Sequence, residues 1–178
     1  MDVNKELESL KKQVEDLKGG NNKLSMVVFS GDLDKLLASF IIATGAIAMG
    51  MEVVMFFTFW ATAALRDKKK KGKGKDIFGK MFGFMLPKGP SKVVLSKMHM
   101  SGMGTGMMKH LMKKKNISSL EEMIALAGEL GVKIYVCEMS MDLMGMKIDE
   151  MIDYPGIQIA GVATFLEQAA GSKIQLFI

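Results

Sequence analysis

The chain has 178 residues and an apolar fraction of 49%, which allows one domain with a buried core and excludes both two full domains and a disordered chain. Its single cysteine, Cys137, excludes an intramolecular disulfide and a multi-cysteine zinc site. The net charge of +5 is unevenly spread, because residues 66–115 hold fifteen Lys and Arg against two Asp, a local charge of +13 that leaves −8 for the rest.

Residues 1–20 are expected to form an amphipathic helix ahead of the main domain. Apolar residues recur there at heptad spacing between Lys and Glu residues: Val3, Leu7, Leu10, Val14 and Leu17. Such a short seam either assists another oligomer interface or packs on its own domain. The charged start of the chain lacks the apolar core of a secretion signal, and a lone thiol is typical of a reducing compartment. We therefore expect a cytoplasmic protein.

From residue 23 to residue 178 the pattern predicts one α/β domain. The expected strands are 24–29, 52–59, 133–137, 157–160 and 174–178. The expected helices are 33–49, 62–66, 107–115, 119–131, 140–144 and 162–170, with a brief helical piece at 151–152. Ser119 and Glu122 form a capping box at the start of the fourth of these helices. Alternation of strands and helices predicts a three-layer α/β/α sandwich around a mainly parallel, five-stranded sheet.

Residues 36–65 contain one charge, Glu52, and are long enough to suggest a membrane-spanning helix. Gly50 and the change of composition near Met51 favour another interpretation. The first half is rich in small residues and typical of a helix, whereas the second half is β-branched and aromatic, like a strand buried on both faces. A buried helix followed by a buried strand therefore explains the run, and it avoids placing Glu52 inside a bilayer.

The basic segment, residues 67–116, is expected to be an insertion in the domain. It combines a Lys- and Gly-rich linker, six bulky apolar residues between 78 and 86, and six methionines between 98 and 112. Basic residues interleaved with Phe and Met suit contact with an acidic protein or an anionic membrane surface through residues 67–112. No nucleic-acid reader motif accompanies the charge, so we expect no nucleic-acid partner.

The chain offers few other catalytic or metal-binding patterns. Met98, His99 and Met100 could hold a soft metal such as copper(I), but the 19 methionines are scattered along the whole chain, which favours a packing role. We expect neither a metal nor a cofactor. The sequence also lacks a His-Glu-x-x-His zinc motif, a phosphate-binding glycine loop after the first strand, and a nucleophilic serine elbow.

Cys137 ends the expected strand 133–137, and Ser140 is expected to begin a helix three residues later. In open parallel sheets, ligands gather at the carboxyl ends of the strands. The backbone N–H groups and dipole of such a helix favour a thiolate and lower the pKa of the thiol, while Glu138 acts in the opposite direction. Two hypotheses remain: a reactive thiol, or a cysteine that simply packs in the core, as free cysteines usually do.

Several short motifs resemble those of the DsrE/DsrF/DsrH-like family of sulfur-relay proteins, in particular the branch sometimes labelled peroxiredoxin-like. The first follows strand 24–29 and reads Ser30-Gly31-Asp32-Leu33-Asp34-Lys35. The others are Phe56-Phe57-Thr58-Phe59-Trp60, Met85-Leu86-Pro87-Lys88-Gly89, Met100-Ser101-Gly102-Met103-Gly104, Cys137-Glu138-Met139-Ser140-Met141 and Gly161-Val162-Ala163. The resemblance runs from about residue 23 to residue 178 and leaves the heptad helix outside.

The resemblance implies a flavodoxin-like or DsrE-like sandwich that assembles into oligomers, and a cysteine that carries sulfane sulfur as a persulfide between donor and acceptor proteins. Carried over, that cysteine is Cys137. Separately, the expected topology places Ser30 and Asp32 at the carboxyl end of the first strand, where they could face the same crevice, and Ser140 at the helix after the cysteine. These three are the candidate binding residues. Because the chain has one cysteine, any transfer runs between molecules. The alternative hypothesis is a non-catalytic oligomeric module that docks on a membrane or an acidic protein through its basic segment.

Overall fold

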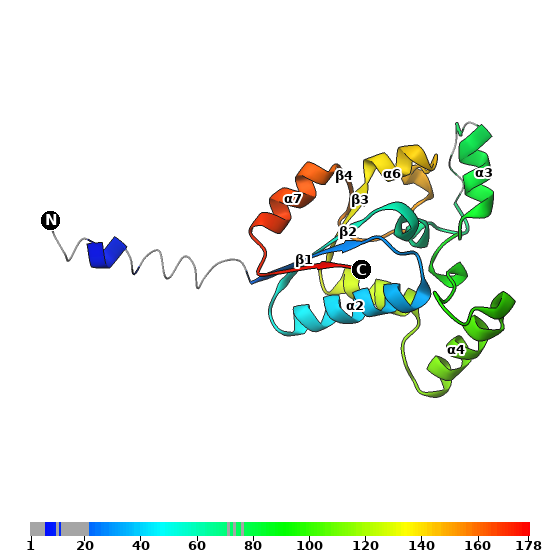
Figure 1. Cartoon of the computed structure of the whole chain (residues 1–178), viewed down its shortest axis with the longest axis horizontal. Helices are drawn as coiled ribbons and strands as arrows, with labels where there is room; N and C mark the ends of the chain where they lie inside the picture. Colours follow the sequence, from blue (N-terminus) through cyan, green and yellow to red (C-terminus); the bar gives the residue numbers. More distant parts are fainter. Residues whose placement is uncertain (1–5, 10, 12–21, 71, 73, 76) are drawn as a thin grey trace.

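Five parallel strands form a sheet in the order β4-β3-β2-β1-β5 within the described part of the chain, which confirms the predicted fold class (Figure 1). The computed structural model describes residues 6–9, 11, 22–70, 72, 74–75 and 77–178. The strands are β1 (Lys23–Val28), β2 (Glu52–Phe57), β3 (Lys133–Cys137), β4 (Ile157–Ala160) and β5 (Ile174–Phe177). Parallel pairing aligns all their carboxyl ends along one edge.

Helices cover both faces of the sheet (Figure 1). On one face, α2 (Leu33–Ala48) packs against α5 (Leu120–Glu129). On the other face lie α6 (Glu138–Leu143) and α7 (Val162–Ala170), the latter in contact with β1 and β4. The basic segment contributes α3 (Ile77–Met85) and α4 (Met103–Lys114). Short 3₁₀ helices span Phe59–Leu65, Pro90–Lys92, Met100–Gly102 and Ile148–Glu150.

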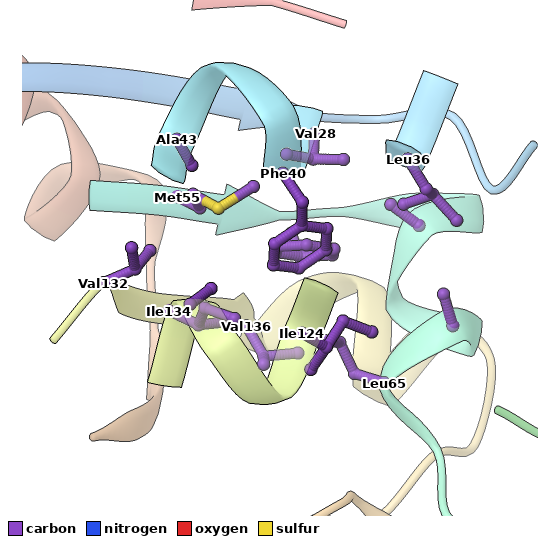
Figure 2. Packing of buried hydrophobic residues seen from close by; sticks show 14 of the residues in the cluster. Val28, Leu36, Phe40, Ala43, Met55, Leu65, Ile124, Val132, Ile134 and Val136 are labelled. Atoms are coloured by element: carbon purple, nitrogen blue, oxygen red, sulfur yellow. The ribbon is translucent and has the colours of Figure 1, made fainter. Parts of the chain in front are cut away.

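The main core lies between the sheet and the α2–α5 layer (Figure 2). In β2 and β3, alternate residues such as Met55 and Val136 point into it, as the two-residue period of a strand requires. Phe40 of α2 fills its centre and is fully buried. The intervening residues Phe56 and Cys137 face the opposite layer, where they meet Phe165 of α7. Strand periodicity therefore places Cys137 under α7 and away from the main core.

The apolar run 36–65 forms a helix and a strand, as predicted. Helix α2 ends at Ala48, and Gly50 adopts a φ of +75°, a conformation that suits glycine and turns the chain into β2. Among the residues that the structure describes, no helix combines the length and the apolar character that crossing a membrane requires.

Several predicted boundaries were wrong. Strand β2 ends at Phe57 instead of residue 59, because Phe59 has a φ of +46° and begins the 3₁₀ helix Phe59–Leu65, which replaces the expected helix 62–66. The brief helical piece lies at Ile148–Glu150, and Met151 instead pairs with Arg66 in an isolated antiparallel bridge. Of the expected N-terminal helix, residues 6–9 and 11 are helical, and the rest of 1–20 lies outside the described residues.

Candidate functional site

Cys137 is the last residue of β3, and α6 starts directly after it at Glu138. The predicted start of this helix at Ser140 was therefore wrong by two residues, and Ser140 lies inside its first turn. Cys137 is opposite Ala160 of the neighbouring β4 and packs with Phe56 and Phe165. Only 5% of its surface is exposed, so the cysteine is almost fully buried at the carboxyl end of β3.

Two buried hydroxyl groups lie beside this cysteine. The Oγ1 atom of Thr58 is 2.8 Å from the Oγ atom of Ser140, and the backbone N–H of Phe59 donates to the same Ser140 oxygen over 3.0 Å. Thr58 follows β2, which is the direct neighbour of β3, so sheet pairing brings the two strand ends together. The Ser140 oxygen is thereby held in one position, and a hydroxyl proton of the pair is available to the sulfur.

The surroundings of Cys137 favour its ionised form. Burial raises the pKa of the thiol, but hydrogen bonds from the side chains of Ser140 and Thr58 and from the amides of Ser140 and Met139 outweigh it. The net result is a pKa below that of an ordinary cysteine. Because the thiolate is the nucleophilic form of cysteine, this arrangement can support thiol exchange near neutral pH.

The structure brings Ser140 to Cys137 but places the other two candidate binding residues farther away. Ser30 and Asp32 follow β1, which is separated from β3 by β2, so their strand ends are about 10 Å apart. The Ser30 hydroxyl donates to the Asp32 carboxylate over 2.8 Å, and Lys35 pairs with the same carboxylate at 3.3 Å.

The turn that holds Ser30 and Asp32 nevertheless contacts the segment that follows β2, next to Thr58. A Cβ atom on Gly31 would lie 2.6 Å from the carbonyl oxygen of Trp60, so the turn packs tightly against the 3₁₀ helix that follows Thr58. Ser30, Thr58 and Cys137 thus mark three adjacent strand ends along one edge of the sheet.

Sequence patterns predicted no role for Thr58, although it lies in the motif Phe56-Phe57-Thr58-Phe59-Trp60. The signal that could have found it is the strand order, because β2 and β3 are neighbours in this fold and their ends must meet.

A pocket of about 620 Å³ lies at the junction of α4 and α5, and its lining residues do not belong to the Cys137 site. Within the described residues, no three His, Cys, Asp or Glu side chains are grouped to hold a metal ion.

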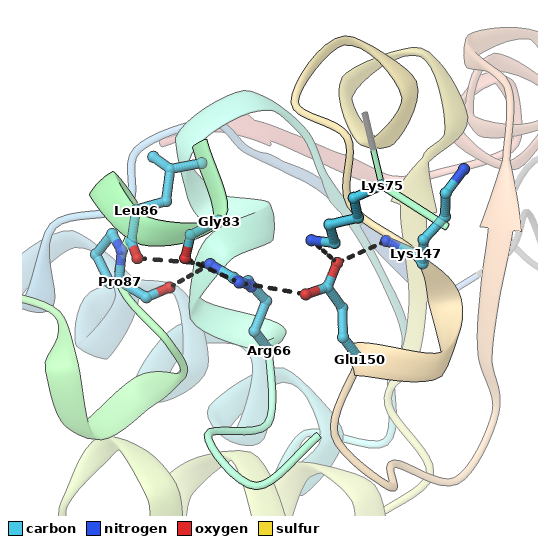
Figure 3. Close-up of polar contacts among 7 residues, drawn as sticks. All are labelled: Arg66, Lys75, Gly83, Leu86, Pro87, Lys147 and Glu150. Carbon is cyan, nitrogen blue, oxygen red and sulfur yellow. Dashed lines mark hydrogen bonds and ion pairs between the residues drawn. The ribbon is translucent and has the colours of Figure 1, made fainter. Parts of the chain in front are cut away.

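A buried ionic cluster lies nearby and was not predicted (Figure 3). Arg66 and Glu150 are almost fully buried and pair at 3.2 Å, and Lys75 pairs with the other oxygen of Glu150. The amide of Lys147 also donates to Glu150 over 2.8 Å. Arg66 donates further to backbone carbonyls of Gly83, Leu86 and Pro87. This cluster ties the basic segment to the loop that follows α6.

Comparisons with known proteins agree with the motifs. The model of the DsrE/DsrF/DrsH-like family matches residues 20–177. The uncharacterized protein YrkE of Bacillus subtilis is 45% identical over 156 residues, which is 88% of this chain and 96% of that protein. The sulfur carrier protein DsrE2 of Allochromatium vinosum is 39% identical over 160 residues, 88% of this chain and 98% of its own.

The fold has a counterpart among solved structures. The ychN protein from E. coli superposes with a TM-score of 0.51 at 12% identity, covering 88% of this chain and 98% of its own. At that identity the likeness concerns the fold alone. The family match extends over most of the described α/β domain, and two relatives share well above 30% identity over nearly their entire length. This chain belongs to the DsrE/DsrF/DrsH-like family.

Proposed function

We propose that this protein is a sulfur carrier, which holds sulfane sulfur on Cys137 and passes it to a partner thiol. The observation that carries the proposal is the environment of Cys137, a cysteine at the carboxyl edge of a parallel sheet beside the Thr58–Ser140 hydroxyl pair. The relative named as a sulfur carrier protein supports it, since 39% identity extends over most of both chains.

The proposed loading step is a thiol exchange on a donor persulfide, R–S–SH. The Cys137 thiolate attacks the outer sulfur, a new S–S bond forms at Sγ, and the S–S bond of the donor breaks. The electron pair leaves with the donor thiolate, RS⁻, and the proton stays on the transferred sulfur. The product is Cys137–S–SH, and the step needs no oxidant or reductant.

Release repeats the exchange in the other direction. An acceptor thiolate attacks the terminal sulfur, and Cys137 leaves as a thiolate. A leaving group departs faster when its pKa is low, so the hydrogen bonds that lower the pKa of Cys137 assist this half of the cycle as well. Because Cys137 is the only cysteine, both donor and acceptor are other molecules.

Partners must reach a thiol that is 95% covered, which favours donors and acceptors that present sulfur at the tip of an extended group. Ser30 and Asp32 are proposed to orient such a group from the end of β1, two strands away from Cys137. We further infer a homo-oligomer, because α7 and β5 leave Val162, Leu166 and Phe177 more than half exposed. A reducing cytoplasm would keep the carrier thiol available between transfers.

The proposal is tested by incubating the full chain and Cys137→Ser with glutathione persulfide and weighing both intact. We expect the wild type to gain the mass of one sulfur atom and Cys137→Ser to gain none. Absence of the adduct across neutral pH would remove the carrier function and leave the non-catalytic docking module as the remaining hypothesis. Equal gain by both proteins would place the sulfur elsewhere than on Cys137.

A further inference from the structure

Helix α3 has two sharply different faces. Of its nine residues, five bulky apolar ones are exposed, with Phe84 at 90% and Ile77 at 81%. At 3.6 residues per turn these five fall within an arc of about 120°. The outer face of α3 consists of these residues: Ile77, Phe78, Met81, Phe84 and Met85. An exposed apolar surface of this extent on so short a helix indicates an interaction site.

The inner face of α3 is fixed to the domain. Gly79 is buried, and a Cβ atom on Gly145, in the loop after α6, would lie 2.3 Å from the Cα atom of Gly79. Phe82 packs against the main core, and the Gly83 carbonyl accepts a hydrogen bond from the buried Arg66 (Figure 3). These contacts hold the helix in one orientation, so the outer face cannot turn inward without breaking them.

Lysines flank the outer face. Between Asp76 and Glu121 the sequence contains eight lysines and no acidic residue. Lys80 on α3 itself and Lys88 just after it are both exposed. Figure 1 shows α3 at the outer margin of the molecule, away from β4 and α7. An exposed apolar helix flanked by lysines is the combination that attracts anionic bilayers, where the apolar face enters the headgroup boundary and the lysines meet phosphates.

We propose that the outer face of α3 docks this protein on an anionic membrane surface as a peripheral contact. Two other occupants fit less well. Protein interfaces are enriched in Arg and depleted in Lys, whereas residues 66–115 hold fourteen lysines and one arginine, Arg66, which is buried. A second copy meeting α3 through a two-fold axis would place two strongly basic segments against each other, and like charges in contact oppose association.

The test is co-sedimentation of the full chain with vesicles of phosphatidylcholine alone or mixed in equal parts with phosphatidylglycerol. We expect binding to the mixed vesicles, loss of that binding at high salt, and little binding to phosphatidylcholine. Phe84→Glu removes a ring that is 90% exposed and should weaken binding roughly tenfold or more without unfolding the protein. Lys80→Glu should weaken it less, through charge alone.

Met49→Glu is the matched control, because Met49 is 79% exposed and lies at the carboxyl end of α2, on the opposite edge of the domain from α3. It should bind the mixed vesicles like the wild type. No binding by the wild type, or equal binding by Phe84→Glu, would overturn the proposal. The proposal would also be overturned if sedimentation showed that the wild type is an oligomer and Phe84→Glu is a monomer, since the outer face would then be an interface between two copies of the chain. The readout is independent of sulfur loading on Cys137.

Discussion

Thr58 and Ser140 are 82 positions apart in the sequence, yet their hydroxyl oxygens lie 2.8 Å apart beside Cys137. The Ser140 oxygen already accepts a hydrogen bond from the Phe59 amide. If Thr58 also donates to this oxygen, the Ser140 hydroxyl donates its own proton to the thiolate. If Ser140 instead donates to Thr58, the Thr58 hydroxyl donates its proton to the thiolate. Either arrangement delivers one hydroxyl proton to the sulfur, and removing either hydroxyl disturbs that arrangement.

Removing the hydroxyls should therefore raise the pKa of Cys137. Hydrogen bonds donated to a thiolate stabilise the charged form, so Ser140→Ala and Thr58→Val shift ionisation to higher pH. At neutral pH we expect iodoacetamide to alkylate Cys137 roughly tenfold more slowly in either variant. The pH dependence of the alkylation rate measures the midpoint directly. Thr58→Ser keeps a hydroxyl and should retain the wild-type midpoint, and identical midpoints in all four proteins would exclude a role for the pair.

Asp32 offers a separate test of the candidate binding residues. Its carboxylate is paired with Ser30 and Lys35 and lies two strands from the cysteine. Asp32→Ala should leave the alkylation midpoint of Cys137 unchanged and slow loading from glutathione persulfide several-fold, because a donor would lose its orientation. Stopped-flow loading rates at fixed pH measure the effect. If loading proceeds at the wild-type rate, Asp32 is no part of the site.

The buried cluster around Glu150 should dominate the acid sensitivity of the fold. Burial raises the pKa of Glu150, but Lys75, the Lys147 amide and Arg66 together lower it below the ordinary value. A carboxyl with a lowered folded pKa stabilises the fold above its unfolded pKa of about 4.3, and this stabilisation is lost as the pH falls through the folded value. The denaturant midpoint should therefore decrease below about pH 4.

Glu150→Gln tests the same cluster at neutral pH. It leaves two buried cations without their carboxylate, so we expect a loss of about 3–5 kcal/mol in the free energy of unfolding. Glu52→Gln removes the exposed pair between Glu52 and Lys133 and should cost less than about 1 kcal/mol. Similar losses in the two variants, measured by urea unfolding, would contradict the structural importance of the cluster.

Sequence patterns identified the elements of this fold better than their ends or their long-range contacts. The capping box of Ser119 and Glu122 is present as predicted, because it depends on residues three positions apart. The end of β2 was misplaced, since Phe59 adopts a positive φ that nothing in its apolar context signals. Helix α3 was described as an apolar patch and not as a helix, because its two glycines weaken helix propensity.

The candidate site was predicted in part for the same reason. Cys137 and Ser140 are close in sequence, and the position of the cysteine at a strand end follows from periodicity alone. Thr58 acts through Ser140, 82 positions away, and Glu150 pairs with Arg66, 84 positions away, so only the folded chain brings these partners together. Contacts between residues close in sequence, such as Cys137 and Ser140, could be inferred from the sequence. The hydroxyl pair and the ionic cluster could not be predicted without knowing the strand order and the packing of the loops.

Gly145 is predicted to secure α3. Its φ of +59° disfavours any side chain, and a Cβ there would collide with the Gly79 backbone. Gly145→Ala should destabilise the fold by about 1–3 kcal/mol and speed tryptic cleavage within 75–88. Gly106→Ala, in the interior of α4 with open space around it, should instead stabilise the fold by up to about 1 kcal/mol. Unchanged cleavage in Gly145→Ala would show that the Gly79 contact does not hold the helix.

Transfer between proteins tests most directly whether Cys137 both accepts and gives up sulfur. The wild type is loaded with glutathione persulfide and freed of the donor. It is then mixed with a reduced thioredoxin whose second active-site cysteine is replaced by serine, so that the acceptor has one reactive thiol and cannot expel the transferred sulfur as sulfide. Both proteins are weighed intact over time. We expect the acceptor to gain reducible sulfur as Cys137 loses it, at a rate proportional to both concentrations and slower in Ser140→Ala. A Cys137 that never loads, or an adduct that stays on Cys137 while the acceptor gains nothing, would contradict it.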